Sequence, residues 1–160
     1  MKKKFLFSTI SLLLLIVLAS NSLAALAAGP RQFHLKGSLE ASETSQGAPP
    51  TVYIDVRSTG NATHLGRYTG QFDVVLQIPS LAGTASGSLV AADGSTLFLE
   101  GQGQGTPTDV PTVISIVETL TITGGTGRFA GATGNVTIER VLDRTTRLSS
   151  GTMSGTIVLP

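Results

Sequence analysis

Beyond residue 30, apolar and polar side chains alternate with a period of two along most of the chain. Successive side chains of a strand point to opposite faces, so this alternation predicts strands that have one apolar face. Gly, Pro, Asn and Asp separate the alternating runs, and the Asp-Gly pair at residues 93–94 is typical of a hairpin turn. The pattern predicts eight strands, at residues 32–40, 51–58, 62–78, 84–92, 96–104, 112–123, 128–142 and 151–159.

The spacing of these strands predicts their arrangement. Short connections favour antiparallel neighbours, and eight strands can close into a barrel that has no exposed edge. Glycines within the strands, such as Gly70 and Gly103, indicate bends that suit a small coiled barrel. We therefore expect an all-β fold, an eight-stranded antiparallel up-and-down barrel of lipocalin-like form, with a two-sheet sandwich as the alternative. Residues 41–51 and 105–111, which are rich in polar and turn-forming types, are expected to be loops.

The N-terminal residues have the organisation of a secretory signal peptide. A basic start at residues 2–4 precedes an apolar run at residues 5–19, which is shorter than the ~20 residues of a membrane-spanning helix. Small residues then offer cleavage after Ala27 or after Ala24. We expect residues 1–27 to be a signal peptide and residues 28–160 to be a single barrel domain. That domain would be secreted, extracellular or periplasmic, and free of the membrane after cleavage.

Removal of this segment changes the charge balance. Residues 28–160 contain 8 basic and 10 acidic residues, a net charge of about −2, and Lys36 is their only lysine. Without a basic patch, neither nucleic acid nor an anionic membrane surface is an expected partner. The chain has no cysteine, and its two histidines have no paired carboxylates nearby in the sequence. The sequence therefore predicts no disulfide, no metal site and no cofactor.

The densest glycine cluster is ITGGTGRFAGATG, at residues 122–134. A dinucleotide-binding loop needs a helix after its glycines, but a strand pattern follows here. A phosphate-binding loop of the Gly-Lys-Ser/Thr type is excluded because no lysine follows Lys36. The cluster instead predicts a hairpin turn and a bend in the next strand, with one aromatic side chain in the core. The residues of this structural turn are Gly124, Gly125, Gly127, Phe129, Gly131 and Gly134.

The surrounding stretch TLTITGGTGRFAGATGNVTIE, at residues 119–139, resembles the hairpin of the allene oxide cyclase and dirigent-like superfamily. There, Gly-Gly-Ser/Thr-Gly-x-Phe-x-Gly/Ala joins two strands. Together with ATHLGRYTG at residues 62–70, it is similar to bacterial secreted members of this barrel group, which have no assigned activity.

The resemblance implies an eight-stranded barrel with a cavity for a small apolar ligand, and it also implies a homo-oligomer. In plant cyclases of the superfamily the barrel closes an unstable oxylipin epoxide, and in dirigent proteins it orients phenoxy radicals. Because only the turn motif aligns with the family, no catalytic residue is carried over to this chain.

Several polar residues share the inward, apolar phase of the predicted strands. Glu118 lies in phase with Ile116 and Leu120, and Arg140 lies in phase with Ile138. A buried charge needs a partner, so these two could pair inside the barrel, although they lie about seven and fourteen residues from the turn. A bulge would instead turn them to solvent. The candidate ligand-binding residues are His64, Tyr68, Glu118 and Arg140.

Two classes of function remain open at this point. The first is a secreted, non-enzymatic barrel that binds a small apolar ligand or acts as a scaffold, including a structural surface protein. The alternative is a cyclase- or isomerase-type enzyme with an oxylipin-like or phenolic-like substrate, whose catalytic residues the sequence does not identify. A filled interior would exclude ligand binding and catalysis alike, because both need a cavity.

Overall fold

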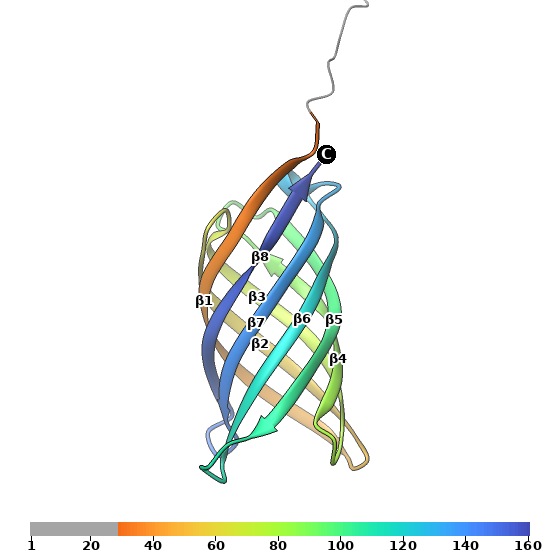
Figure 1. Ribbon diagram of the computed structural model, residues 1–160, viewed down its shortest axis with the longest axis vertical. Coiled ribbons are helices and arrows are strands. Elements are labelled where there is room, and N and C mark those ends of the chain that lie inside the picture. Colours follow the sequence, from red (N-terminus) through yellow and green to blue (C-terminus); the bar gives the residue numbers. More distant parts are fainter. Residues whose placement is uncertain (1–28) are drawn as a thin grey trace, which may run out of the picture.

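The structure, a computed structural model, describes residues 29–160, so the expected signal peptide lies outside the described residues. Eight antiparallel strands form one closed barrel in chain order, and the first strand pairs with the last (Figure 1). This confirms the eight-stranded antiparallel barrel and excludes the sandwich. The strands are β1 (Arg31–Ala48), β2 (Thr51–Ala62), β3 (Gly66–Gln77), β4 (Ala82–Val90), β5 (Thr96–Pro107), β6 (Val113–Gly125), β7 (Thr133–Asp143) and β8 (Leu148–Leu159).

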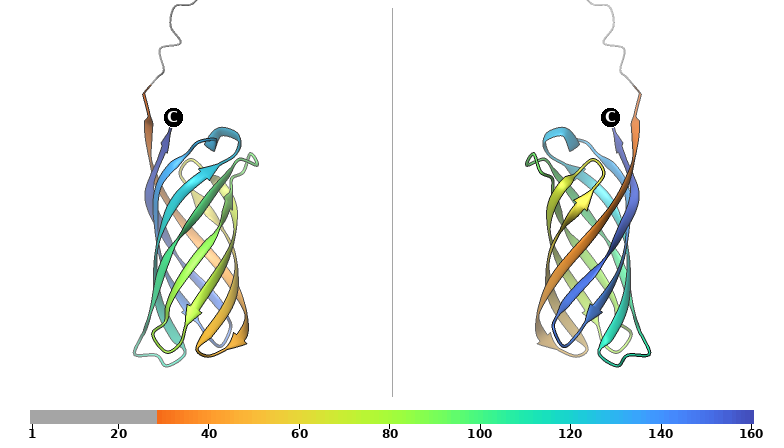
Figure 2. Two further views of the ribbon diagram at one scale, coloured as in Figure 1. Left: turned by 90° about the vertical axis from the view of Figure 1, so that its right-hand side faces the viewer. Right: turned by 90° about the vertical axis from the view of Figure 1, so that its left-hand side faces the viewer.

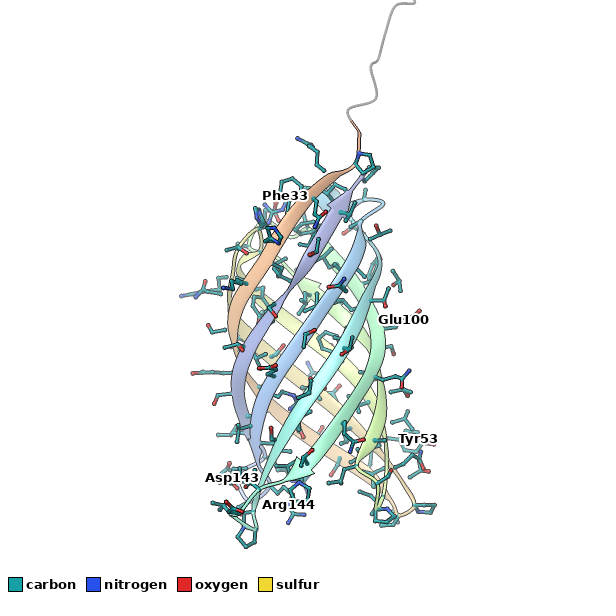
Figure 3. The ribbon with its side chains drawn as sticks, in the orientation of Figure 1. Phe33, Tyr53, Glu100, Asp143 and Arg144 are labelled. Carbon is teal, nitrogen blue, oxygen red and sulfur yellow. The ribbon has the colours of Figure 1, made fainter. Side chains whose placement is uncertain are left out.

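The two ends of the barrel carry different elements. The upper end in Figure 1 has the start of β1, the end of β8 and the β2–β3, β4–β5 and β6–β7 connections, and both views of Figure 2 agree. The lower end has the other four turns. Phe33 marks the upper end in Figure 3, and Asp143 and Arg144 mark the β7–β8 turn at the lower end.

The interior is packed at the upper end and open at the lower end. Leu65 and Phe129, from two of the upper connections, and Leu97, at the start of β5, are at most 2% exposed. Inward-facing residues near the lower end, such as Leu76 and Leu142, are only half-buried. Side chains that point into a closed barrel can meet solvent only through its lumen. The lumen is therefore accessible from below and closed above.

Residues 41–48 were expected to form a loop, and that expectation is wrong. They continue β1, pairing with β2 down to Ala48, and leave Pro49 and Pro50 as the turn. The inward phase of Leu35 and Leu39 continues through Ala41 to Glu43, which is buried. The composition is polar here because the lower interior holds a charged side chain and the outer face is solvated. The other expected loop, 105–111, is also shorter, because β5 extends to Pro107.

The single strand expected at residues 62–78 is divided by a turn. β2 ends at Ala62, β3 begins at Gly66, and His64 between them has a φ of 62°. Leu65 in this turn is fully buried at the packed upper end. Leu65 is out of phase with the inward residues on either side, but the even-numbered phase of Ala62 resumes at Tyr68, so a period of two counted across the turn does not reveal the break.

The glycine cluster forms the β6–β7 connection but is longer than a tight hairpin turn. Gly124 and Gly125 end β6, a short 3-10 helix follows at Gly127–Phe129, and β7 begins only at Thr133. Gly127 and Gly131 have φ angles of 59° and 73°, which residues other than glycine rarely adopt. The structure thus confirms a glycine-dependent turn with Phe129 in the core and corrects the expected start of the seventh strand.

Phe129 plugs the upper end, so Phe129→Ala should reduce the free energy of unfolding by about 3–5 kcal/mol through the cavity it leaves. Phe98 is the matched control, because it points outward from β5 and is 44% exposed. Phe98→Ala should change stability by about 0.5 kcal/mol or less. Chemical denaturation of both variants measures the difference, and equal losses would show that Phe129 is not a plug.

Candidate functional site

An ion cluster is buried inside the lower half of the barrel around Arg140. The Nε and Nη2 atoms of Arg140 donate to Oε2 and Oε1 of Glu118 at 3.1 and 3.2 Å. Its Nη1 atom donates to the hydroxyl of Ser149 at 3.0 Å and to Oε1 of Glu43. We call these four residues, Glu43, Glu118, Arg140 and Ser149, the Arg140 cluster.

The cluster joins strands that are far apart in the sequence. Its residues come from β1, β6, β7 and β8, and the Glu43–Arg140 contact spans 97 residues. In the register of β6 and β7, Glu118 lies opposite Ile138, and Arg140 lies opposite Ile116. The two charged residues are therefore diagonal neighbours on the inner face. The unequal distances from the turn that the sequence showed are absorbed by the 3-10 helix and the residues after it.

Electrostatics keep Arg140 charged in this buried position. All four residues of the cluster are 5–8% exposed. Burial is the largest single effect and disfavours the charged guanidinium, but the charges and hydrogen bonds of Glu118 and then Glu43 together outweigh it. The pKa of Arg140 is consequently raised above its ordinary value. A guanidinium held between two carboxylates is a fixed positive charge inside an apolar barrel.

Below the cluster lies a cavity of about 70 Å³, which we call the lower cavity. The glycines of β4 and β5 provide part of its wall. A Cβ atom added at Gly103 would lie 2.9 Å from Cγ of Glu118, so glycine at this position leaves room for the glutamate side chain. The cavity has a largely apolar wall, and its inner end, which we call its base, is charged because it meets the Arg140 cluster. Its lining includes Ile54, Val74, Leu76, Ile116, Leu142 and the cluster residues Glu43, Glu118 and Arg140.

Two polar groups of the cluster remain available to a ligand. A guanidinium has five N–H groups, and Arg140 uses four of them, which leaves one on Nη2. Within residues 29–160, Oε2 of Glu43 accepts no hydrogen bond, yet no fully buried side-chain polar atom lacks a partner. That oxygen therefore faces accessible space. Arg140 and Glu43 both line the lower cavity, so its lining includes one residue with a spare donor and one with a spare acceptor.

The structure separates the four residues that the sequence selected. Glu118 and Arg140 meet in the cluster. Tyr68 also points inward, but it packs in the upper core, where its hydroxyl donates to the carbonyl of Ser38 at 3.0 Å. Burial raises the pKa of the Tyr68 phenol. Tyr68 lines neither the lower cavity nor any surface that a ligand could reach.

His64 does not lie in the barrel interior, and its placement there was wrong. It is exposed in the β2–β3 turn, its ring lies 5.0 Å from that of Phe33, and its carbonyl accepts from Nη2 of Arg128 at 2.6 Å. The turn reverses the chain, so His64 leaves the inward phase of β3. Arg128, which also pairs with Asp93 at 3.1 Å, connects the three upper connections.

Glu43 and Ser149 are functional candidates that sequence reasoning missed. Both sit in polar stretches that were assigned to a loop or left outside a strand. The signal for Glu43 was present, because counting by two from Leu35 through Leu39 places it inward. An inward carboxylate on the first strand would have been a natural partner for an inward arginine.

Within residues 29–160, no group of three or more His, Cys, Asp or Glu side chains is arranged to hold a metal ion. No helix of this part of the chain is long and apolar enough to cross a membrane.

The fold and the cluster define a class of molecule, a closed eight-stranded barrel with a charged base to an apolar lumen. Among solved structures it is similar to two pterocarpan synthase dirigent proteins. GePTS1 has a TM-score of 0.57 at 15% identity, over 88% of this chain and 97% of that one. PsPTS1 has a TM-score of 0.56 at 15% identity, over 79% and 94%. The chain therefore has a dirigent-like barrel fold. No protein-family model and no curated protein matches the sequence.

Arg140→Met should leave two buried carboxylates without a cation and reduce the free energy of unfolding by about 3–5 kcal/mol. The triple variant Arg140→Met, Glu43→Leu, Glu118→Leu removes all three charges and should recover most of that loss, because apolar residues can replace a buried ion cluster. Urea denaturation of the two variants distinguishes the cases. A single variant as stable as the wild type would contradict the closed cluster.

The raised pKa of Tyr68 predicts that the folded protein loses stability at alkaline pH. The folded state keeps the phenol protonated while the unfolded state ionises near pH 10, so stability is lost as pH rises above 10. At pH 11 this one group should cost about 1.4 kcal/mol relative to pH 8. Tyr68→Phe should be less stable than the wild type by a constant amount below pH 10, and this difference should shrink above pH 10 because the variant lacks this part of the alkaline loss. Identical pH profiles for the two proteins would refute the assignment.

Proposed function

We propose that this protein is a secreted, non-enzymatic barrel that binds a small apolar ligand carrying one hydrogen-bonding group. The ligand's polar atom lies at the Arg140 cluster, and its apolar part lies along the lower cavity toward the open end. Secretion is part of the proposal and is supported by the organisation of residues 1–27. We further propose that the chain is a bacterial member of the allene oxide cyclase and dirigent-like group, supported by the hairpin at residues 119–139.

The single observation that carries the binding proposal is the composition of the lower cavity. Its apolar wall ends at a base where Arg140 has one unused N–H and Glu43 has one unused oxygen. Few polar groups at the end of an apolar pocket are the usual means of fixing a ligand's orientation. A hydroxyl group, which both donates and accepts, satisfies the two free groups at once.

The size of the cavity limits what enters it. Small-molecule sites commonly measure about 300–1,000 Å³, whereas the lower cavity measures about 70 Å³. Only one end of a ligand, with its polar atom foremost, fits at the cluster. The rest of the ligand lies against half-buried apolar side chains at the mouth, among them Leu76 and Leu81.

The two solved neighbours are named pterocarpan synthases, and that activity is not extended to this chain. At 15% identity the likeness shows the fold alone. Binding without turnover fits the cluster, since Arg140 already contacts both carboxylates.

The proposal predicts that the protein binds 1-hexanol more tightly than its isomer 1-methoxypentane, which has no hydroxyl donor for Glu43. Ile116→Trp fills the lower cavity from β6 and should weaken 1-hexanol binding at least tenfold. Val117→Trp is the matched control, because Val117 is the next residue of the same strand and points outward, 45% exposed. Isothermal titration calorimetry on the wild type and both variants measures the affinities.

Equal binding by the two tryptophan variants would place any alcohol site outside the lower cavity and refute the proposal. Consumption of the alcohol, followed by gas chromatography, would refute the non-enzymatic part alone.

A further inference from the structure

The barrel interior continues above the Arg140 cluster. A second cavity of about 20 Å³, which we call the inner cavity, lies between the cluster and the packed upper core. Its wall includes Leu39, Phe72, Leu89 and Met153, with the hydroxyl-bearing Ser58 as a polar neighbour. A cavity of this size holds about one water molecule or one methyl group. It is a short apolar extension of the lumen.

The two cavities share one boundary. Val56, Ala85, Glu118 and Arg140 line both of them, and these residues come from β2, β4, β6 and β7. On the β2–β4 side the boundary is small and apolar. On the β6–β7 side it consists of the two long charged side chains. What separates the cavities is therefore the ion pair reaching into the lumen.

Glu118 makes the strongest contacts with Arg140, but its removal would not leave Arg140 without a counter-charge. Without it, Glu43 still supplies one negative charge and Ser149 still accepts a hydrogen bond from Nη1. The cluster would then be a neutral pair instead of a guanidinium between two carboxylates. Glu118 also lies between the two cavities, and glycine at position 103 on the neighbouring strand leaves room for its side chain.

We propose that Glu118, held by two hydrogen bonds from Arg140, is a specificity-determining partition of the lumen. It limits the ligand to molecules whose polar atom is terminal, because a second apolar arm beyond that atom would need the space that Glu118 occupies. The inner cavity is the subsite that such an arm would enter if the partition were absent. This inference rests on the proposed function, since it assumes that the polar atom of the ligand binds at the cluster.

A series of alcohols with a growing second arm tests the partition. The molecules 1-hexanol, 2-heptanol and 3-octanol share one five-carbon tail and carry no arm, a methyl arm or an ethyl arm on the carbinol carbon. For the wild type, affinity should fall with each arm carbon. For Glu118→Ala, it should rise by about fourfold per arm carbon, the gain expected for burying one methylene group. Glu118→Gln retains the volume of the side chain and should show the falling series.

The outcomes separate this inference from the proposed function. If no alcohol binds the wild type, the proposed function fails. If 1-hexanol binds but the arm has the same effect in all three proteins, the partition is refuted and the proposed function stands. Titration calorimetry gives the affinities, and circular dichroism melts show whether each variant is folded.

Met153→Ala keeps the inference testable if Glu118→Ala does not fold. Met153 lines the inner cavity but not the lower one, so this variant enlarges the space beyond an intact partition. With the partition closed, the falling series of the wild type should be unchanged. Tighter binding of 3-octanol to Met153→Ala would show that ligands already reach the inner cavity, which would overturn the proposal.

Discussion

A charged side chain that points into a closed barrel can reach bulk water only along the lumen, and Arg140, which is buried there, is in that position. A lone buried guanidinium would be strongly unfavourable, so the lumen must supply its counter-charges. They come from Glu118 on the neighbouring strand and from Glu43 on the strand beyond β8. Buried ion pairs contribute little net stability compared with apolar packing. They do penalise every register that separates them, and here that penalty acts across the β1–β8 pair that closes the barrel.

The cluster also divides the interior into two halves that differ in packing. Above it, fully buried side chains such as Leu35, Leu65 and Tyr68 fill the lumen. Below it, inward residues are half-buried around a cavity. An eight-stranded barrel is just wide enough to be filled by its own side chains. An open half therefore requires small residues or glycines at some of its inward positions. The polar groups lie where the filled half ends, so a ligand that enters from below passes the apolar wall and reaches them at the inner end of the cavity.

The alternation of apolar and polar residues predicts most of the barrel. Prediction from the sequence is wrong where the alternation does not mark the end of a strand. Strand number, direction and inward phase follow from rows such as Ile114, Ile116 and Leu120. The turn at His64 is concealed because the even-numbered inward phase of β2 resumes at Tyr68 in β3, and the end of β1 is concealed because its inward residue is Glu43. The pairing of Glu118 with Arg140 follows from their shared phase, but the length of the connection between them depends on a 3-10 turn. Three-dimensional closure alone brings Glu43 to Arg140.

The glycines in the wall of the lower cavity leave the room that the charged side chains of β6 and β7 need. On the neighbouring strands β5 and β6, Glu118 lies directly opposite Gly103, and the side chain of Ile114 lies beside Gly105. A Cβ at Gly103 would press on Glu118, and one at Gly105 would lie 3.2 Å from both Ile114 and Leu81. Alanine at these positions would therefore displace the cluster and narrow the cavity together. Strand-interior glycine is unfavourable for a sheet on its own, so its presence here reflects the room that the charged base and the cavity need.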